Sequence, residues 1–238
     1  MNRPKRGVAL KVFGEFACFS RPEFKVERVS YVVPTPSAAR GILEAIFWKP
    51  EFRYQIREIH ILRLGTQVSI LRNEIADRQS RKPITVEHAR QQRTSLILKD
   101  VAYVIRAELV LRTTDTEPGK YLDQFNRHLE KGQCHHTPCL GTREFAAAFE
   151  PAGDDDRGEL QNPGLTLNLG NMLFDIAYVR GRDNRDNELQ FWKGSGEGRQ
   201  IVSGHAVPLF FKASIQQGVI SVPGEEYTRL YSLEDGNA

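Results

Sequence analysis

The sequence predicts an α+β protein, in which a ferredoxin-like (RRM-type) N-terminal domain over residues 1–150 precedes a smaller C-terminal antiparallel β-sheet domain over residues 159–238. Two observations support this fold class. The first 150 residues follow the order strand, helix, strand, strand, helix, strand, which is the ferredoxin-like arrangement. After them, short apolar segments alternate with Gly, Asn, Asp and Pro, as antiparallel strands alternate with turns.

The first strand and the first helix carry clear local signals. Residues 8–19 alternate between apolar and polar side chains, as a half-buried strand does. Thr35 can cap a helix and Pro36 fits its first turn, so we expect a helix from there to about Lys49. Three residues at i, i+4 and i+7 spacing are expected to share one face of this helix: Arg40, Glu44 and Phe47.

The remaining elements of the N-terminal domain follow from the same signals. Residues 55–64 and 101–112 alternate in polarity and predict two further strands. A second helix is expected over residues 119–131, because its apolar residues recur with helical spacing and Gly132 can end it. A fourth strand is expected around residues 143–149.

Positive charge is concentrated in the first half of the chain. Residues 1–112 hold 21 Lys and Arg against 11 Asp and Glu, whereas residues 113–238 hold 12 against 19. The excess is densest around the polar, arginine-rich stretch 66–94, which we expect to form a long hairpin or loop. Because arginine suits phosphate contacts and base stacking, this asymmetry predicts a polyanionic partner. A solvated surface with segregated charges is the alternative.

Common nucleotide-binding and hydrolase motifs are absent from the sequence, which holds no GxxxxGK[ST], HExxH or GxSxG pattern. Four candidate zinc ligands lie within six positions: Cys134, His135, His136 and Cys139. Ligands this close in sequence rarely converge on one centre, so we expect a turn-forming loop between Gly132 and Gly141, with no metal and no cofactor. The loop histidines and His128 are candidate proton carriers.

Two further features bear on location and ligands. Three cysteines form no disulfide framework and no apolar run approaches the roughly 18 residues that cross a bilayer, so we expect a cytoplasmic protein without a membrane partner. Lys120 and Tyr121 open the second helix, where the helix dipole favours an anion such as phosphate. An exposed helix start with an amphipathic tyrosine is the alternative.

Four segments resemble the type I-C (Dvulg subtype) CRISPR-associated Cas5 family. They are residues 13–19 (FGEFACF), 30–42 (SYVVPTPSAARGI), 47–50 (FWKP) and 140–145 (LGTREF). The resemblance spans most of the chain and implies a modified RNA-recognition fold with a C-terminal antiparallel sheet. It also implies a metal-independent endoribonuclease that cuts the repeat hairpin of precursor CRISPR RNA, stays on the 5′ handle of its product and joins an interference complex.

The resemblance also implies the reaction and the partners. A ribose 2′-hydroxyl attacks the adjacent phosphorus and a 5′-hydroxyl leaves, which yields a 2′,3′-cyclic phosphate. The expected partners are precursor and mature CRISPR RNA and the other subunits of the interference complex. Duplex DNA is a further candidate for the basic half.

The family's catalytic positions are a Tyr at the end of the first helix and a Lys-His pair that opens the second, and they fall on Phe47, Lys120 and Tyr121. Lys120 would stabilise the developing charge. Tyr121 would handle a proton, whereas Phe47 can only stack or shape the site. His128 lies i+7 from Tyr121 and is a substitute proton carrier. The expected RNA contacts are Arg40, Lys49, Arg78, Arg81, Lys82, Gly132, Gly141 and Arg143.

Two alternatives stay open. Because Phe47 and Tyr121 depart from the family pattern, the chain could be a non-catalytic, RNA-binding structural subunit of the same complex. It could also be a zinc-stabilised nucleic-acid-binding module built around Cys134 and Cys139.

Overall fold

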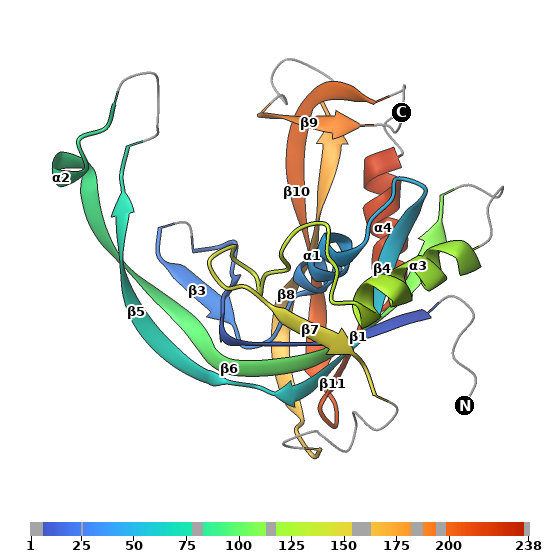
Figure 1. The fold of residues 1–238 in the computed structure, drawn as a ribbon. Helices are drawn as coiled ribbons and strands as arrows, with labels where there is room; N and C mark the ends of the chain where they lie inside the picture. The colour runs from blue at the N-terminus through green and yellow to red at the C-terminus, as the bar shows by residue number, and fades with distance from the viewer. Residues whose placement is uncertain are drawn as a thin grey trace.

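The computed structural model describes residues 7–24, 26–77, 83–112, 118–153, 163–181, 188–193 and 199–235. Within these ranges, an eight-stranded sheet and a three-stranded sheet pack with helices (Figure 1), which confirms the α+β class. The strands are β1 (Gly7–Ala17), β2 (Phe19–Ser20), β3 (Arg28–Tyr31), β4 (Phe52–Arg63), β5 (Thr66–Ile75), β6 (Arg90–Leu111), β7 (Ala148–Pro151), β8 (Leu167–Arg180), β9 (Leu189–Lys193), β10 (Gln200–Ile215) and β11 (Val219–Ser221). The helices are α1 (Pro36–Ile46), α2 (Val86–Ala89), α3 (Gly119–Glu130) and α4 (Gly224–Asp235).

The centre of the larger sheet has the ferredoxin-like strand order β4-β6-β1-β7, with every neighbouring pair antiparallel. Helices α1 and α3 connect these strands and pack against β4, β1 and β7. The predicted succession of two strand-helix-strand units is therefore confirmed. It places the end of α1 beside α3, which is the region where the expected catalytic positions lie.

Helix α1 begins as predicted but ends earlier. The Thr35 side chain accepts a hydrogen bond from the Ala38 backbone N–H at 3.1 Å, and Pro36 occupies the first turn. The helix ends at Ile46, and Phe47 has extended backbone (φ −152°). The expectation that Phe47 shares a face with Arg40 and Glu44 is therefore wrong, because the chain has already left the helix at that residue.

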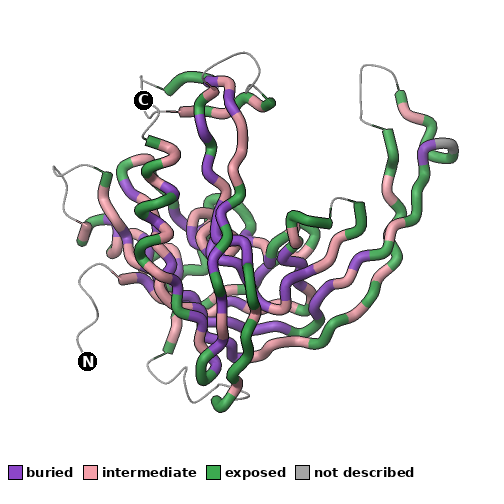
Figure 2. The backbone as a smooth tube through the Cα atoms, turned by 180° about the vertical axis from the view of Figure 1, so that it is seen from behind, coloured by how far each residue is buried: buried purple, intermediate pink, exposed green. Residues whose placement is uncertain are grey.

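The arginine-rich stretch forms a regular hairpin, so the hairpin prediction is confirmed over its described part. Strand β5 pairs with residues 90–99 of β6, and we call this pair, together with α2, the arm. The arm projects from the body of the molecule (Figure 1), and its outer half is mostly exposed (Figure 2). Half-buried residues alternate with exposed ones along β5, but too few of them are apolar to give a clear strand signal.

The fourth strand of the ferredoxin-like unit begins later than expected. Residues 143–147 turn instead of extending, because the Leu140 N–H donates to the Phe145 carbonyl and closes a tight loop. Strand β7 then starts at Ala148. Gly141 has φ +89°, and a Cβ there would lie 1.9 Å from the Cys18 carbonyl oxygen. Only glycine allows this loop to lie so close to the chain between β1 and β2.

The C-terminal region contributes a sheet of its own and also completes the first one. Strands β8, β10 and β9 form an antiparallel sheet, whereas β11 pairs with β4 of the larger sheet, so the segment around residues 218–222 does not belong to the smaller one. Helix α4, which the sequence analysis did not anticipate, packs on β8. The Ile56 N–H donates to the hydroxyl of Tyr227 in this helix at 2.7 Å. Buried residues of both sheets form one hydrophobic cluster; the proposed boundary between residues 150 and 159 stays a prediction.

Across the described ranges, the helices are too short or too polar for any of them to cross a membrane.

Candidate functional site where α1 meets α3

The end of α1 lies against the last turn of α3. The Phe47 side chain is 3% exposed, and its ring meets the His128 ring edge-on with centroids 5.4 Å apart. The Phe47 ring also lies 5.7 Å from the Phe52 ring. The Tyr54 hydroxyl donates to the Phe47 carbonyl at 2.9 Å and fixes the backbone at this point. The structure therefore brings together Phe47 and His128, two residues singled out separately in the sequence.

The start of α3 completes the cluster. The Tyr121 ring lies 5.2 Å from the Phe52 ring, and only 6% of the residue is exposed. Lys120 is exposed, with its Nζ 6.0 Å from the centroid of the Tyr121 ring. Pro118 precedes the helix without a side-chain cap, so Lys120 adds its charge to the positive end of the helix dipole. We name Phe47, Lys120, Tyr121 and His128 the α1/α3 cluster.

His128 has a defined hydrogen-bonding arrangement. Its Nδ1 lies 3.3 Å from the carbonyl oxygen of Ile46, the last residue of α1. A carbonyl only accepts, so this contact requires a proton on Nδ1. In the neutral imidazole, Nε2 then carries the lone pair and can accept a proton. The ring contact with Phe47 thus places a nitrogen that can accept a proton beside one of the family's catalytic positions.

The loop after α3 is also attached to the end of α1. The backbone N–H groups of His135 and His136 donate to the Ala45 carbonyl at 2.8 and 2.9 Å, and both side chains are exposed. Gly132 (φ +62°) ends α3 as predicted, with the Gln133 N–H donating to the His128 carbonyl. Among the described residues, which include Cys134 and Cys139, no group of three or more His, Cys, Asp or Glu is arranged to hold a metal ion.

The expected RNA contacts are scattered over the structure. Lys49 and Arg143 are both exposed. Lys49 lies two positions after Phe47 of the α1/α3 cluster, and Arg143 lies in the tight loop over residues 140–145, which we name the Gly141 loop. Arg40 instead makes a two-pronged pair with Asp175 of β8, at 2.8 and 3.0 Å, and a third contact with Glu44 at 2.9 Å. These contacts favour an internal role for Arg40 over the expected RNA contact. Three expected contacts lie outside the described residues: Arg78, Arg81 and Lys82.

Arg72 and Arg93 of the arm, and Arg28 of the neighbouring β3, are paired with acids. Glu144 of the Gly141 loop accepts hydrogen bonds from Arg28 and Arg72, at 2.8 and 2.7 Å. Partial burial opposes ionisation of Glu144, but the two guanidinium groups lower its pKa overall. On the same face, Arg93 Nε lies 3.6 Å from a Glu74 carboxylate oxygen. The base of the arm is thereby attached to the loop before β7.

Two aromatic residues that hold Phe47 in place were not predicted from the sequence. Phe52 and Tyr54 both lie on β4, are fully buried and contact Phe47. Their signal in the sequence is the recurrence of aromatic residues at positions 47, 52 and 54, which alternate once the chain enters β4. Together they hold the residue after α1 against α3.

Comparisons with known proteins give a consistent result. The Cas5d family model, described as "CRISPR-associated protein (Cas_Cas5)", matches residues 7–223. A Thermus thermophilus protein named "CRISPR pre-crRNA endoribonuclease Cas5d" is 60% identical over 230 residues, which cover 96% of each chain. A Mannheimia succiniciproducens protein of the same name is 37% identical over 91% of this chain and 94% of its own. A solved structure titled "Crystal Structure of CRISPR-associated Protein" has a TM-score of 0.63 at 23% identity, over 93% of this chain and 94% of that one, and shares the fold.

Proposed function

Because the chain belongs to the CRISPR-associated Cas5 family, in its Cas5d branch, we propose that it is a pre-crRNA endoribonuclease. In this proposal it cuts the repeat hairpin of precursor CRISPR RNA, keeps the 5′ handle and serves as a subunit of the interference complex. The observation that carries the proposal is the 60% identity, over 96% of both chains, with the Thermus thermophilus pre-crRNA endoribonuclease. Duplex DNA is a further candidate partner through the basic N-terminal half.

The proposed reaction starts with the ribose 2′-hydroxyl on the 5′ side of the scissile phosphate. Nε2 of His128 takes the proton of this hydroxyl, whose oxygen attacks the phosphorus. The bond from phosphorus to the 5′ oxygen then breaks, and the leaving oxygen receives a proton to give a 5′-hydroxyl. The other product carries a 2′,3′-cyclic phosphate. Lys120, exposed at the positive end of α3, stabilises the charge that develops on the phosphate oxygens.

The other two residues of the α1/α3 cluster have supporting roles. The Phe47 ring has no proton to transfer, and its edge-on contact orients the imidazole of His128. Tyr121 is the second proton carrier, for the leaving 5′ oxygen, through the hydroxyl at the end of its packed ring. In this proposal, the RNA backbone is held by the exposed Lys49 and Arg143. It is also held by the contacts predicted from the sequence, which are Arg78, Arg81, Lys82 and the Gly132–Gly141 loop.

A second candidate function is a structural, non-catalytic subunit that only binds the processed RNA. Two observations favour it: Phe47 lacks the hydroxyl of the family position, and Tyr121 is packed against its surroundings, with only 6% of the residue exposed. In that case Lys120 would hold a phosphate without promoting its cleavage.

Incubation of the purified protein with a repeat hairpin RNA separates the two functions. The endoribonuclease should cut the RNA in EDTA, because a 2′-hydroxyl nucleophile needs no metal, and should leave a cyclic phosphate on the upstream fragment. A single deoxyribose 5′ of the scissile phosphate should abolish cleavage and leave binding nearly unchanged. His128→Gln should slow cleavage by roughly 10²-fold or more, within the range for a general base. Cleavage of the deoxy-substituted RNA would rule out the mechanism, and binding without cleavage would favour the structural subunit.

A further inference from the structure

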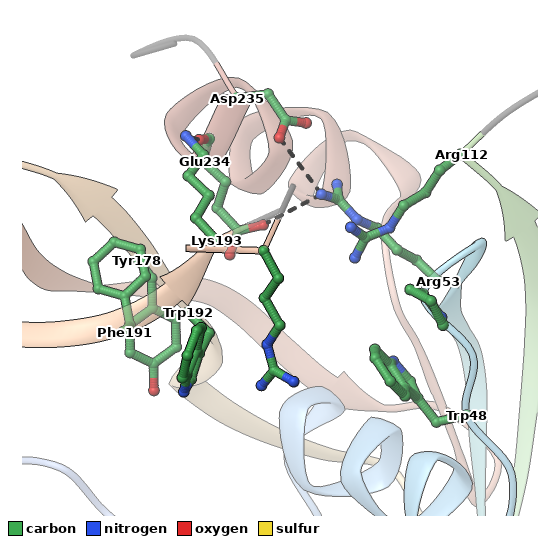
Figure 3. A pocket seen from close by; sticks show the side chains of 11 residues that line it. Trp48, Arg53, Arg112, Tyr178, Phe191, Trp192, Lys193, Glu234 and Asp235 are labelled. Atoms are coloured by element: carbon green, nitrogen blue, oxygen red, sulfur yellow. Dashed lines mark hydrogen bonds and ion pairs between the residues drawn. The ribbon is translucent and has the colours of Figure 1, made fainter. Parts of the chain in front are cut away.

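A pocket of about 660 Å³ opens between the α1–β4 turn, β9 and the end of α4 (Figure 3). Its size falls within the roughly 300–1,000 Å³ typical of small-ligand sites. Its walls come from parts of the chain far apart in sequence, from Trp48 in the turn to Asp235 at the end of α4. Neither the proposed mechanism nor the sequence analysis gives these residues a role.

Aromatic rings face each other across the pocket. Trp48 and Trp192 lie on opposite sides of it (Figure 3), and 47% and 57% of these residues are exposed. Tyr178 and Phe191 continue the wall beside Trp192, with ring centroids 5.5 Å apart. Tryptophans half-exposed in a concave site offer flat apolar faces that a planar ring can cover.

Positive charge lines the same pocket. Arg53 is neutralised in part by Asp235 and Glu234, at 3.5 and 3.8 Å. The guanidinium of Arg112 makes no hydrogen bond or ion pair within the described part of the chain, and partial burial together with the charge of Arg53 lowers its pKa. The guanidinium of Arg199 stacks over the Trp192 ring, with its Cζ atom 4.5 Å from the ring centroid. An anion bound between Arg112 and Arg53 would relieve the repulsion between them.

We propose that this pocket binds one unpaired nucleotide of the RNA, with its base stacked between Trp48 and the Arg199 guanidinium that covers Trp192, and its phosphate held by Arg112. Stacking on aromatic rings beside cations is how proteins bind single strands without reading their sequence. A base pair inside a duplex exposes no face to stack upon, so the site selects an unpaired nucleotide. An acidic peptide would satisfy the arginines but would leave the Trp48 indole uncovered.

The position of the pocket identifies which nucleotide it takes. Trp48 directly follows Phe47 of the α1/α3 cluster. The Arg112 N–H donates to the Glu51 carbonyl at 2.8 Å, so the end of β6 is attached to the same turn. The turn over residues 47–51 thus separates the pocket from the proposed cleavage site. The occupant is a nucleotide of the single-stranded flank next to the hairpin, and this assignment rests on the proposed function.

The test uses a repeat hairpin with its single-stranded flanks, blocked by a deoxyribose at the scissile position, and 2-aminopurine placed at one unpaired position at a time. Stacking on tryptophan quenches this base, so we expect strong quenching on binding at one flank position. Trp48→Ala should remove that quenching, Trp192→Ala should reduce it because Arg199 loses the ring on which it stacks, and each should weaken binding about 10-fold, the scale of one stacked base. Phe24→Ala is the matched control, because Phe24 is 48% exposed and lines no part of the pocket.

A hairpin trimmed of its flanks provides the second arm of the test. Both tryptophan variants should bind it as tightly as the unsubstituted protein, which also shows that they are folded. Equal loss on flanked and trimmed RNA, or quenching that survives in both variants, would overturn the nucleotide pocket while leaving the cleavage assay untouched. Tryptophan-dependent quenching by a protein that never cleaves would instead reject the proposed endoribonuclease and keep the pocket.

Discussion

The arm and the pocket beside the α1–β4 turn both contain arginines, but their surroundings differ. In the arm, Arg72 and Arg93 lie next to Glu144 and Glu74, so each guanidinium already has an anionic partner. In the pocket, Arg112 has no such pair within the described residues, and Arg199 covers an indole ring. An arginine that is already paired gains little from a phosphate, because one anion only replaces another.

The difference shows why the number of arginines does not locate an RNA-binding surface. The arginine-rich stretch predicts an RNA contact along the arm, yet Arg72 and Arg93 are already paired with Glu144 and Glu74. The stronger single-strand site lies where cations and half-exposed aromatic rings occur together. The following predictions compare the arm with the α1/α3 cluster, which adjoins the pocket through the turn over residues 47–51.

The largest expected effect is in the α1/α3 cluster, at Lys120. Lys120→Ala removes the charge at the start of α3 and should lower the cleavage rate by about 10²-fold or more, with little change in RNA affinity. Single-turnover cleavage and equilibrium binding measure the two quantities separately. Lys131→Ala, an exposed lysine just after the same helix, is the control and should keep the full rate. Full activity of Lys120→Ala would contradict the proposal that Lys120 stabilises the charge on the phosphate oxygens.

An intermediate effect is expected at the arm, on binding alone. Joint replacement of Arg78, Arg81 and Lys82 by Ala should flatten the slope of log affinity against log salt by roughly 0.7 for each phosphate that the protein no longer neutralises. Arg72→Ala should leave that slope unchanged, since Arg72 already pairs with Glu144. Titrations at four or more salt concentrations give the slopes. A change with Arg72→Ala equal to that of the triple variant would contradict the expectation that pairing with Glu144 keeps Arg72 from contacting RNA.

The smallest effect is expected at Phe47. Phe47→Tyr restores the hydroxyl of the family position within a ring of the same shape, so the cleavage rate should stay equal or rise by roughly a few-fold. Phe47→Ala should slow cleavage more, because it removes the ring that contacts His128. Rate measurements on both variants, with melting curves to check folding, decide the matter. A collapse of the rate in a folded Phe47→Tyr protein would mean that the site requires an apolar ring.

Local signals predicted much of the fold. The Thr35 cap, the stop at Gly132 and the strand over most of residues 101–112 follow from neighbours along the chain, and each is confirmed, although residues 101–105 are buried on both faces of the sheet. The spacing of His128 from Tyr121 followed from the helix period once α3 was recognised, whereas the contact of His128 with Phe47 was not predicted. Helix α4 had a readable start in Pro223 and two glutamates, with Tyr227, Leu230 and Tyr231 at helical spacing, but the run of short strands before it masked that signal.

Other features depend on contacts between distant residues and could not be predicted locally. Phe47 leaves the Arg40 face because Tyr54 holds its carbonyl from the next strand. The pocket joins Trp48, Arg112 and Trp192 through the folding of both sheets. The pairing of Arg40 with Asp175 is 135 positions apart in the chain, so the motif around Arg40 gave no sign that its charge is used internally.

Strand β11 has a consequence for how the protein matures on the ribosome. Residues 219–221 pair with His60, Ile59 and Glu58 on β4, so the edge of the first sheet is filled by a segment made about 160 residues later. Until that segment emerges, the nascent chain exposes an open strand edge and the apolar face that Ile220 later covers. Phe47 and Tyr121 of the α1/α3 cluster pack on Phe52 of the same strand β4. We therefore expect cleavage activity only from chains whose synthesis has passed residue 221.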